Sequence, residues 1–179
     1  YSMRNHVFEP IEKEVYMESL SLHLHVRTLT NLELFGSKIK ALIERTAARD
    51  LYDVYNMLML PVFSVSEQSL LRKIVILYLA IGGNTPPNTD FNFKAIDNLN
   101  FSQIKRKLIP VLKKSDKFEF EVAKSKVKTY LTTLMVLTDN EKLFLERFNQ
   151  KIYQPELLFD ELDIVGRIND HPMAIWKCS

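Results

Sequence analysis

The chain has little of several features that define whole classes of protein. It contains one cysteine, Cys178, which excludes a disulfide-stapled scaffold and a thiolate zinc site and favours a reducing compartment. The longest uninterrupted apolar run, from Ile74 to Ile81, has eight residues, whereas a helix needs roughly 20 to cross a bilayer. The N-terminus has no basic-then-apolar signal pattern. We therefore expect a soluble, cytoplasmic protein.

The composition is otherwise that of a globular domain. Hydrophobic residues make up 46% and charged residues 26% of 179 residues, which argues against disorder. A chain of this length forms about one domain and needs no metal to hold its core. The net charge is only +2, but residues 102–128 contain nine Lys or Arg and three acidic residues. This basic stretch is typical of a nucleic-acid surface, or of a solvated helix face.

The first thirty residues predict β-strands. Apolar and polar residues alternate strictly from Leu20 to Arg27, which is the period of a half-buried strand. Tyr1–Phe8 predicts an earlier strand that ends before Pro10, and Lys13–Met17 predicts a weaker one. Since two or three strands make a poor independent sheet, we expect them to form the edge of a larger sheet whose remainder is not in this chain.

After Thr30 the apolar spacing becomes helical. Asn31 is the expected cap of the first helix, and Ser66 or Ser69 the expected cap of a later one. Helices are predicted over 31–45, 49–60, from 66 or 69 to 81, and over 101–109, 119–137 and 139–149, with a break at 46–48 and a loop over 84–92. The predicted fold class is α+β and helix-rich: a short antiparallel β segment (1–30), then an α-helical bundle (31–179), which we take as two domains.

A dense group of charged residues lies at the predicted break between the first two helices. Lys38 and Arg45 are seven residues apart and therefore share a helix face. Arg49 either extends that stripe or opens the next helix together with Asp50. A Lys point charge, an Arg fork and an Asp that holds a cation or accepts a proton suit a polyphosphate ligand. The alternative is an ordinary surface ion pair between Arg49 and Asp53.

The same residues resemble two motifs of a known family. The first run is Lys38-x-x-Ala41-Leu42-x-x-Arg45, and the second is Arg49-Asp50-Leu51-Tyr52-Asp53-x-Tyr55. They resemble the third and fourth motifs of the AbiEii-type nucleotidyltransferase toxins. These toxins are found in abortive-infection and toxin–antitoxin loci of phage defence. The run from His171 to Trp176 also resembles a tail segment of that family. The resemblance spans essentially the whole chain, with the strands first and the helices after them.

The resemblance implies a polymerase-β-like nucleotidyltransferase that binds a nucleoside triphosphate with Mg²⁺ and transfers a nucleotide, in some members to tRNA. It also implies a cognate antitoxin. Carried over to this chain, Lys38 contacts the triphosphate, Arg45 braces it, and Asp50 orients Lys38 or assists proton removal. Arg49 adds a nucleotide-binding cation and Asp53 supports the group. Such roles suit phosphoryl transfer, which depends on positioning and charge neutralisation.

One part of the superfamily pattern is missing from the sequence. Members have a Gly-Ser or Gly-Gly turn and then an Asp-x-Asp or Asp-x-Glu pair on a strand, which holds the metal ions. Gly36-Ser37 does not supply it, because Asp50 and Asp53 are three residues apart in a predicted helix, and strand carboxylates on one face are two apart. We therefore expect this chain to be a C-terminal portion, with the Mg²⁺ ligands outside it.

Two other interpretations stay open from the sequence. The chain could be a non-catalytic helical module that binds an antitoxin or RNA through residues 102–128, because the metal carboxylates are missing and that stretch is basic. His23 and His25, two apart on a predicted strand, point to the same face and are a conceivable pair of metal ligands, or simply sheet-surface histidines.

Overall fold

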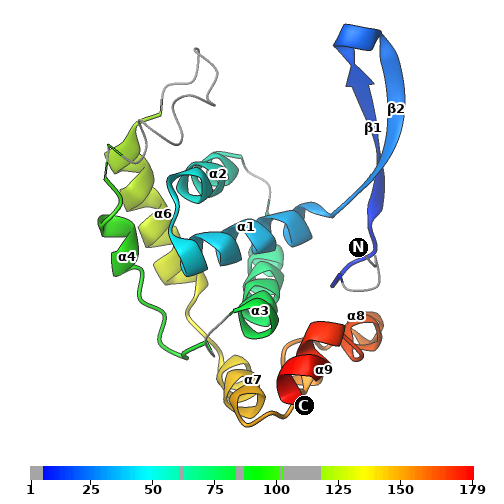
Figure 1. Ribbon diagram of the computed structural model, residues 1–179, viewed down its shortest axis with the longest axis vertical. Coiled ribbons are helices and arrows are strands. Elements are labelled where there is room, and N and C mark those ends of the chain that lie inside the picture. The colour runs from blue at the N-terminus through cyan, green and yellow to red at the C-terminus, as the bar shows by residue number, and fades with distance from the viewer. Residues whose placement is uncertain (1–5, 61–62, 84–86, 101, 103–117) are drawn as a thin grey trace.

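A two-stranded antiparallel hairpin precedes a set of packed helices (Figure 1). This computed structural model describes residues 6–60, 63–83, 87–100, 102 and 118–179. The hairpin consists of β1 (Ile11–Met17), a 3-10 turn η2 (Glu18–Leu20) and β2 (Leu22–Thr28). The helices are α1 (Asn31–Arg45), α2 (Ala48–Leu58), α3 (Val65–Gly82), α4 (Lys94–Asp97), α6 (Phe120–Leu134), α7 (Asp139–Asn149), η4 (Pro155–Leu157), α8 (Leu162–Ile168) and α9 (Pro172–Cys178). The predicted fold class is confirmed.

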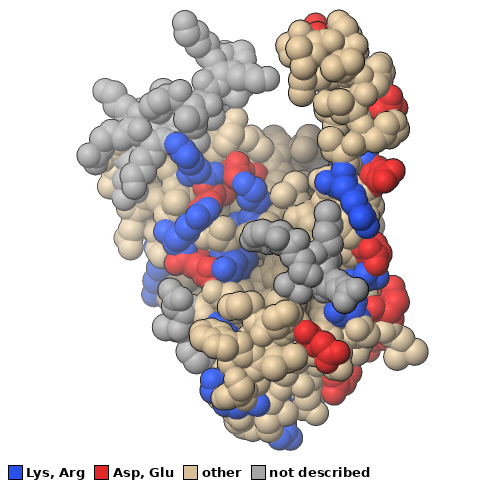
Figure 2. All heavy atoms as spheres, turned by 45° about the vertical axis from the view of Figure 1, so that its right-hand side comes forward, with Lys and Arg blue, Asp and Glu red and all other residues tan. Residues whose placement is uncertain are grey.

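The hairpin stands away from the helices, as the projection at the upper right of Figure 2 shows. The register places Val15 opposite Leu24 and Tyr16 opposite His23. Because paired residues point to the same side of a sheet, one face is mostly apolar, with Ile11, Val15, Met17, Leu22, Leu24 and Val26. All six side chains are exposed. No third strand pairs with the hairpin among the described residues, so its expected place at the edge of a larger sheet stays a prediction.

The strand predicted over Tyr1–Phe8 is wrong for residues 6–8, where the chain bends, and residues 1–5 lie outside the described part. The amides of Val7 and Phe8 donate to the Glu33 carboxylate instead of to a neighbouring strand. The weaker prediction, Lys13–Met17, is confirmed within β1.

The helix starts are set by capping side chains next to those predicted. The hydroxyl of Thr30, not Asn31, accepts the amide of Glu33 at the start of α1. Ser64, rather than Ser66 or Ser69, forms a reciprocal capping box with Glu67 at the start of α3, and such a box satisfies two otherwise unpaired amides. The predicted break at 46–48 is confirmed at residues 46 and 47, whereas Ala48 already begins α2.

The later helices agree with the sequence in part. Helix α7 has the predicted bounds, α6 ends three residues earlier than expected, and α3 stops at the predicted Gly82-Gly83 pair. The helix predicted over 101–109 lies outside the described residues apart from Ser102. In the described part of the chain, no helix is both long and apolar enough to pass through a membrane.

The core forms where α1 crosses α3. Ile39 and Leu42 of α1 are fully buried, as are Leu71 and Ile74 of α3. Gly36 permits this close approach, because a Cβ at this position would lie 2.5 Å from Cγ2 of Ile74. The Ile74 side chain therefore packs directly against the backbone of α1 at Gly36, and this contact holds α1 in a defined orientation.

Substitution of Gly36 should show how tightly this crossing is packed. We expect Gly36→Ala to lower the free energy of unfolding by about 1–3 kcal/mol, because overpacking outweighs the gain in helix propensity. Gly166→Ala in α8 is the matched control: a Cβ there meets nothing within 4 Å, so the protein should gain about 0.5–1 kcal/mol. Urea unfolding of both variants measures the difference, and equal effects would contradict the close approach.

A buried carboxylate ties the base of the hairpin to the helices. Glu33 is 1% exposed, and its oxygens accept the amides of Val7 at 3.1 Å and Phe8 at 3.2 Å and the hydroxyl of Tyr78. The segment before β1 is thereby fixed to α1 and α3. Burial raises the pKa of Glu33 to about 7, although the two amides and the charge of Arg167 act in the opposite direction.

This raised pKa makes a specific prediction about stability. Because the folded protein holds the proton of Glu33 more tightly than the unfolded chain, its contribution is complete below pH 4.5 and is lost as the pH rises through about 7. We expect Glu33→Gln to flatten the dependence of unfolding free energy on pH over this range, by up to about 3 kcal/mol. The exposed Glu121→Gln should leave the curve unchanged. An unaltered slope in Glu33→Gln would contradict this.

Candidate nucleotide site

Two ion pairs hold the junction between α1 and α2. Lys38 Nζ lies 2.6 Å from Asp53 Oδ2. Arg45 donates through Nε and Nη2 to the two carboxylate oxygens of Asp50, both at 2.7 Å. Thr46, in the left-handed region with φ 45°, ends α1 and turns the chain into α2. The turn therefore places the carboxylates of α2 beside the cations of α1.

The two pairs differ in burial and so in rigidity. Asp50 is 2% exposed, while the Arg45 side chain is 67% exposed. The hydrogen bonds and charge of Asp50 raise the pKa of Arg45, and the bidentate fork fixes the plane of the guanidinium. Lys38 and Asp53 are both partly exposed. Arg45 is thus a fixed, solvent-facing cation, and Lys38 is a more adaptable one.

The structure brings the predicted site residues together on α1 and α2, with one difference in pairing. Asp53, not Asp50, contacts Lys38, and Asp50 holds Arg45. The seven-residue spacing correctly placed Lys38 and Arg45 along one helix, and Arg49 lies in the first turn of α2. Which carboxylate meets which cation depends on the geometry of the interhelix turn, which the sequence pattern does not specify.

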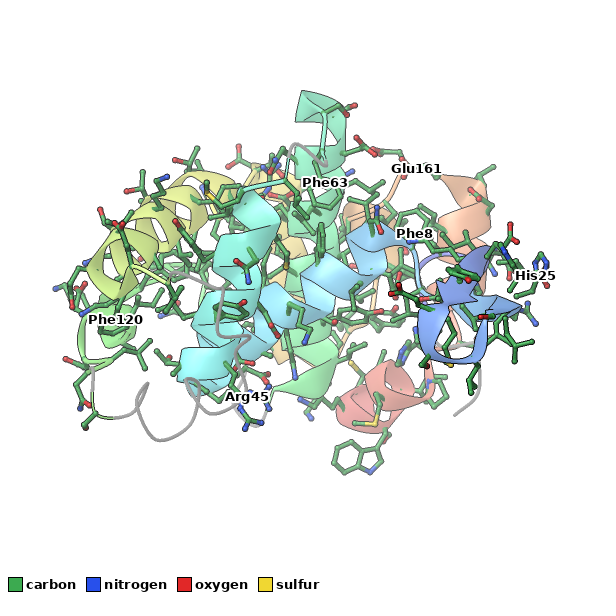
Figure 3. The ribbon with its side chains drawn as sticks, turned by 90° about the horizontal axis from the view of Figure 1, so that it is seen from above. Phe8, His25, Arg45, Phe63, Phe120 and Glu161 are labelled. Carbon is green, nitrogen blue, oxygen red and sulfur yellow. The ribbon has the colours of Figure 1, made fainter. Side chains whose placement is uncertain are left out.

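Arg45 also lines a pocket that sequence analysis missed. The pocket has a volume of about 530 Å³ and lies between the ends of α1 and α3 and the segment that contains Asn88, Phe91 and Asn92. Figure 3 shows Arg45 at the end of α1 farthest from Phe8. In the sequence this segment predicted only a loop, because its Asn-rich composition is typical of turns. Its proximity to Arg45 is a consequence of tertiary structure.

A carboxylate metal site is not found in the described part of the chain. No three His, Cys, Asp or Glu side chains there are grouped so that they could hold a metal ion. Asp50 and Asp53 are each engaged by a cation. On the hairpin, His23 Nδ1 lies 2.6 Å from a Glu14 oxygen. The described residues therefore do not fit a magnesium centre, and no metal ligand is assigned to His23 or His25.

The described end of the basic stretch makes several contacts within the protein. Lys124 donates to the carbonyls of Asp97 at 3.1 Å and Leu99 at 3.2 Å. Lys128 pairs with the Asp97 carboxylate. Lys126 lies 6.0 Å from the centre of the Tyr55 ring. These lysines hold α4 and α2 against α6, while residues 103–117 lie outside the described part.

Comparison with known proteins gives the family. The family model described as "Nucleotidyl transferase AbiEii toxin, Type IV TA system" matches residues 1–133, about three quarters of the chain. The chain belongs to the AbiEii nucleotidyl transferase toxin family. No curated protein and no solved structure matches it. The matched range of this AbiEii-family chain includes Lys38, Arg45, Asp50 and Asp53, whereas α7, α8 and α9 lie beyond it.

The difference in burial between the two aspartates can be tested by stability. Asp50→Asn removes the charge from a buried bidentate partner, so we expect a loss of about 1–3 kcal/mol in unfolding free energy. Asp53→Asn weakens a partly exposed ion pair and should cost less than about 1 kcal/mol. Urea denaturation of the two isosteric variants compares them directly. A larger cost for Asp53→Asn would contradict the assignment of Asp50 as the buried anchor.

Proposed function

We propose that the junction of α1 and α2 binds the triphosphate of a nucleoside triphosphate for nucleotide transfer. The observation that supports this most directly is the fixed Arg45 guanidinium, two turns along α1 from the partly exposed Lys38 ammonium, each with its own aspartate. Triphosphate oxygens are matched by an Arg fork and a Lys point charge. Membership of a nucleotidyl transferase family supports the reaction type.

In this proposal the aspartates position the cations. Asp50 keeps Arg45 in one orientation, which lowers the entropy lost when phosphate oxygens bind. Asp53 holds Lys38 through a single contact, and an incoming phosphate replaces that contact without moving the backbone. Arg49, in the first turn of α2, adds positive charge to the same region. Charge that develops on the phosphate during transfer is thereby neutralised.

The pocket beside Arg45 suits the nucleoside end of such a ligand. Its volume of about 530 Å³ lies within the usual range for small-molecule sites. Phe91 supplies an aromatic ring, and Asn88 and Asn92 supply amide donors and acceptors. An aromatic ring beside amides is suited to a nucleobase, because every base offers a stacking face and polar edges.

The remaining participants are proposed from membership of the family. A type IV toxin–antitoxin family implies an antitoxin partner. Transfer to tRNA, a need for Mg²⁺ and a place in cytoplasmic phage defence are part of the proposal. Since the described residues do not fit a magnesium centre, no step of the proposed mechanism is assigned to a metal held by them. The chain's own residues bind and orient the triphosphate.

Lys38→Ala tests the proposal. In the complete protein, we expect it to abolish transfer of labelled nucleotide to tRNA. We also expect binding of inorganic tripolyphosphate to weaken at least about tenfold, because the Lys38 ammonium charge is lost. The melting temperature should fall by no more than about 2 °C, since the ion pair with Asp53 is partly exposed. Filter binding, calorimetry and thermal melting measure the three quantities.

Lys142→Ala is the matched control, because Lys142 also pairs with one aspartate on an exposed helix surface. It should leave both transfer and tripolyphosphate binding unchanged. Undiminished transfer by Lys38→Ala would contradict the assigned site. Salt-dependent RNA binding by the unmodified chain, with no transfer and no tripolyphosphate binding, would instead favour the helical RNA-binding module.

A further inference from the structure

A second pocket lies beside α1, and Lys38 is not part of its lining. It has a volume of about 670 Å³ and is enclosed by the segment before β1, by α1, by the end of α3 and by α9. Its apolar wall is formed by Leu29, Ala41, Ile81 and Met173. Lys38 and Lys40 differ by about 200° around the helix, so the two lysines point to different sides of α1. This pocket adjoins the one beside Arg45, because Gly82 lines both.

The lining of this pocket has one carboxylate, that of Glu33, and its oxygens are bonded to donors of the protein. Glu33 accepts the amides of Val7 and Phe8 and the hydroxyl of Tyr78. Its oxygens are therefore engaged by donors from the protein, and the raised pKa of Glu33 leaves much of it uncharged near neutral pH. Glu33 therefore adds little negative charge to the pocket. An anion would instead compete with the Glu44 carboxylate for the Lys40 ammonium.

A cation lies at the edge of the same pocket, above a glycine. Lys40 Nζ is 2.6 Å from Glu44 Oε2, which accounts for one of its three protons. The ammonium rests against Gly82, where a Cβ would lie 2.9 Å from Nζ. From α9, Lys177 donates to the carbonyls of Ala80 and Gly83 at the end of α3, which adds positive charge on this side.

Two histidines belong to the polar part of the lining. His171 is 5% exposed, and its Nδ1 accepts the amide of Met173 at 3.2 Å, so the neutral ring has its proton on Nε2. His6 lies 3.5 Å from Glu33 through Nδ1, and burial lowers its pKa. The Ser37 and Tyr78 hydroxyls donate to the Leu34 carbonyl and to Glu33, so Lys40 is the group of this lining that carries a positive charge.

We propose that this pocket binds a small organic anion, with its apolar body against Leu29, Ala41, Ile81 and Met173 and its carboxylate or phosphate head on Lys40. An apolar wall with a few convergent polar groups is the usual design of a small-molecule site. The volume admits a ligand of drug-like size, and the ion pair with Glu44 keeps Lys40 extended over Gly82 until the head group binds.

The full chain, labelled with ¹⁵N, tests this by NMR titration with three probes that share one ring: phenyl phosphate, benzoate and benzyl alcohol. We expect the better of the two anions to bind at least about fivefold more tightly than the alcohol, because a charge-assisted contact is added. Amide shifts should centre on Ala41, Ile81 and Met173. The order of phenyl phosphate and benzoate identifies which head group the site prefers.

Two variants remove the Lys40 contact in different ways. Lys40→Gln removes the positive charge. Gly82→Ala keeps the Lys40 charge but displaces its ammonium, because the added Cβ would lie 2.9 Å from Nζ. Each should weaken binding of the preferred anion at least about fivefold and leave the alcohol unchanged. Lys38→Gln and Lys142→Gln, which alter lysines outside this pocket, should leave anion binding here unchanged.

Several results would overturn the proposal. Equal affinity for the alcohol and both anions would show that no head-group site exists. Unchanged anion binding in both Lys40→Gln and Gly82→Ala would show that Lys40 does not make the contact. Shifts centred on Lys38 and Arg45 would show that the anions bind at the proposed triphosphate site instead. If Lys40→Gln fails to fold, Gly82→Ala decides, because it retains every native side chain.

Discussion

The close approach of α1 to α3 at Gly36 and Ile74 is the constraint on which the rest of the structure depends. A Cβ at Gly36 would be 2.5 Å from the Ile74 side chain, so this crossing admits no larger residue without movement. Every functional candidate is built on the helix that is fixed there. Lys38 and Arg45 face α2, while Glu33 and Lys40 face the second pocket. A shift of α1 would therefore disturb both sites at once.

Around this fixed helix, the depth of burial of each acidic residue decides its structural role. Asp50 is buried and holds an exposed arginine, so it converts a flexible side chain into an oriented donor. Glu33 is buried as well, but it accepts main-chain amides and anchors the hairpin. Asp53 is partly exposed and makes one contact with Lys38. Burial thus makes Asp50 and Glu33 fixed anchors and leaves Asp53 an exchangeable partner of Lys38. The sequence alone does not distinguish these three carboxylates.

Much of the helical part could be predicted because its signals are local. Helix α7 begins after a Thr138 cap whose partner, Glu141, is three residues away, and its apolar spacing is regular. The strand predicted over Tyr1–Phe8 failed at its end because a distant residue, Glu33, binds those amides. The pocket beside Arg45 was missed for the same reason: Phe91 and Arg45 are far apart in the chain.

The sequence by itself determined the helix-rich class, the break between α1 and α2, and the motif residues that identify the family. These depend on spacing within one or two turns, where side-chain direction follows directly from position. Only the tertiary structure decided that Asp53 meets Lys38, that Asp50 is the buried anchor, and that Lys40 rests over Gly82. Such pairings depend on the turn at Thr46 and the α1–α3 crossing, because burial and distance between helices are properties of packing.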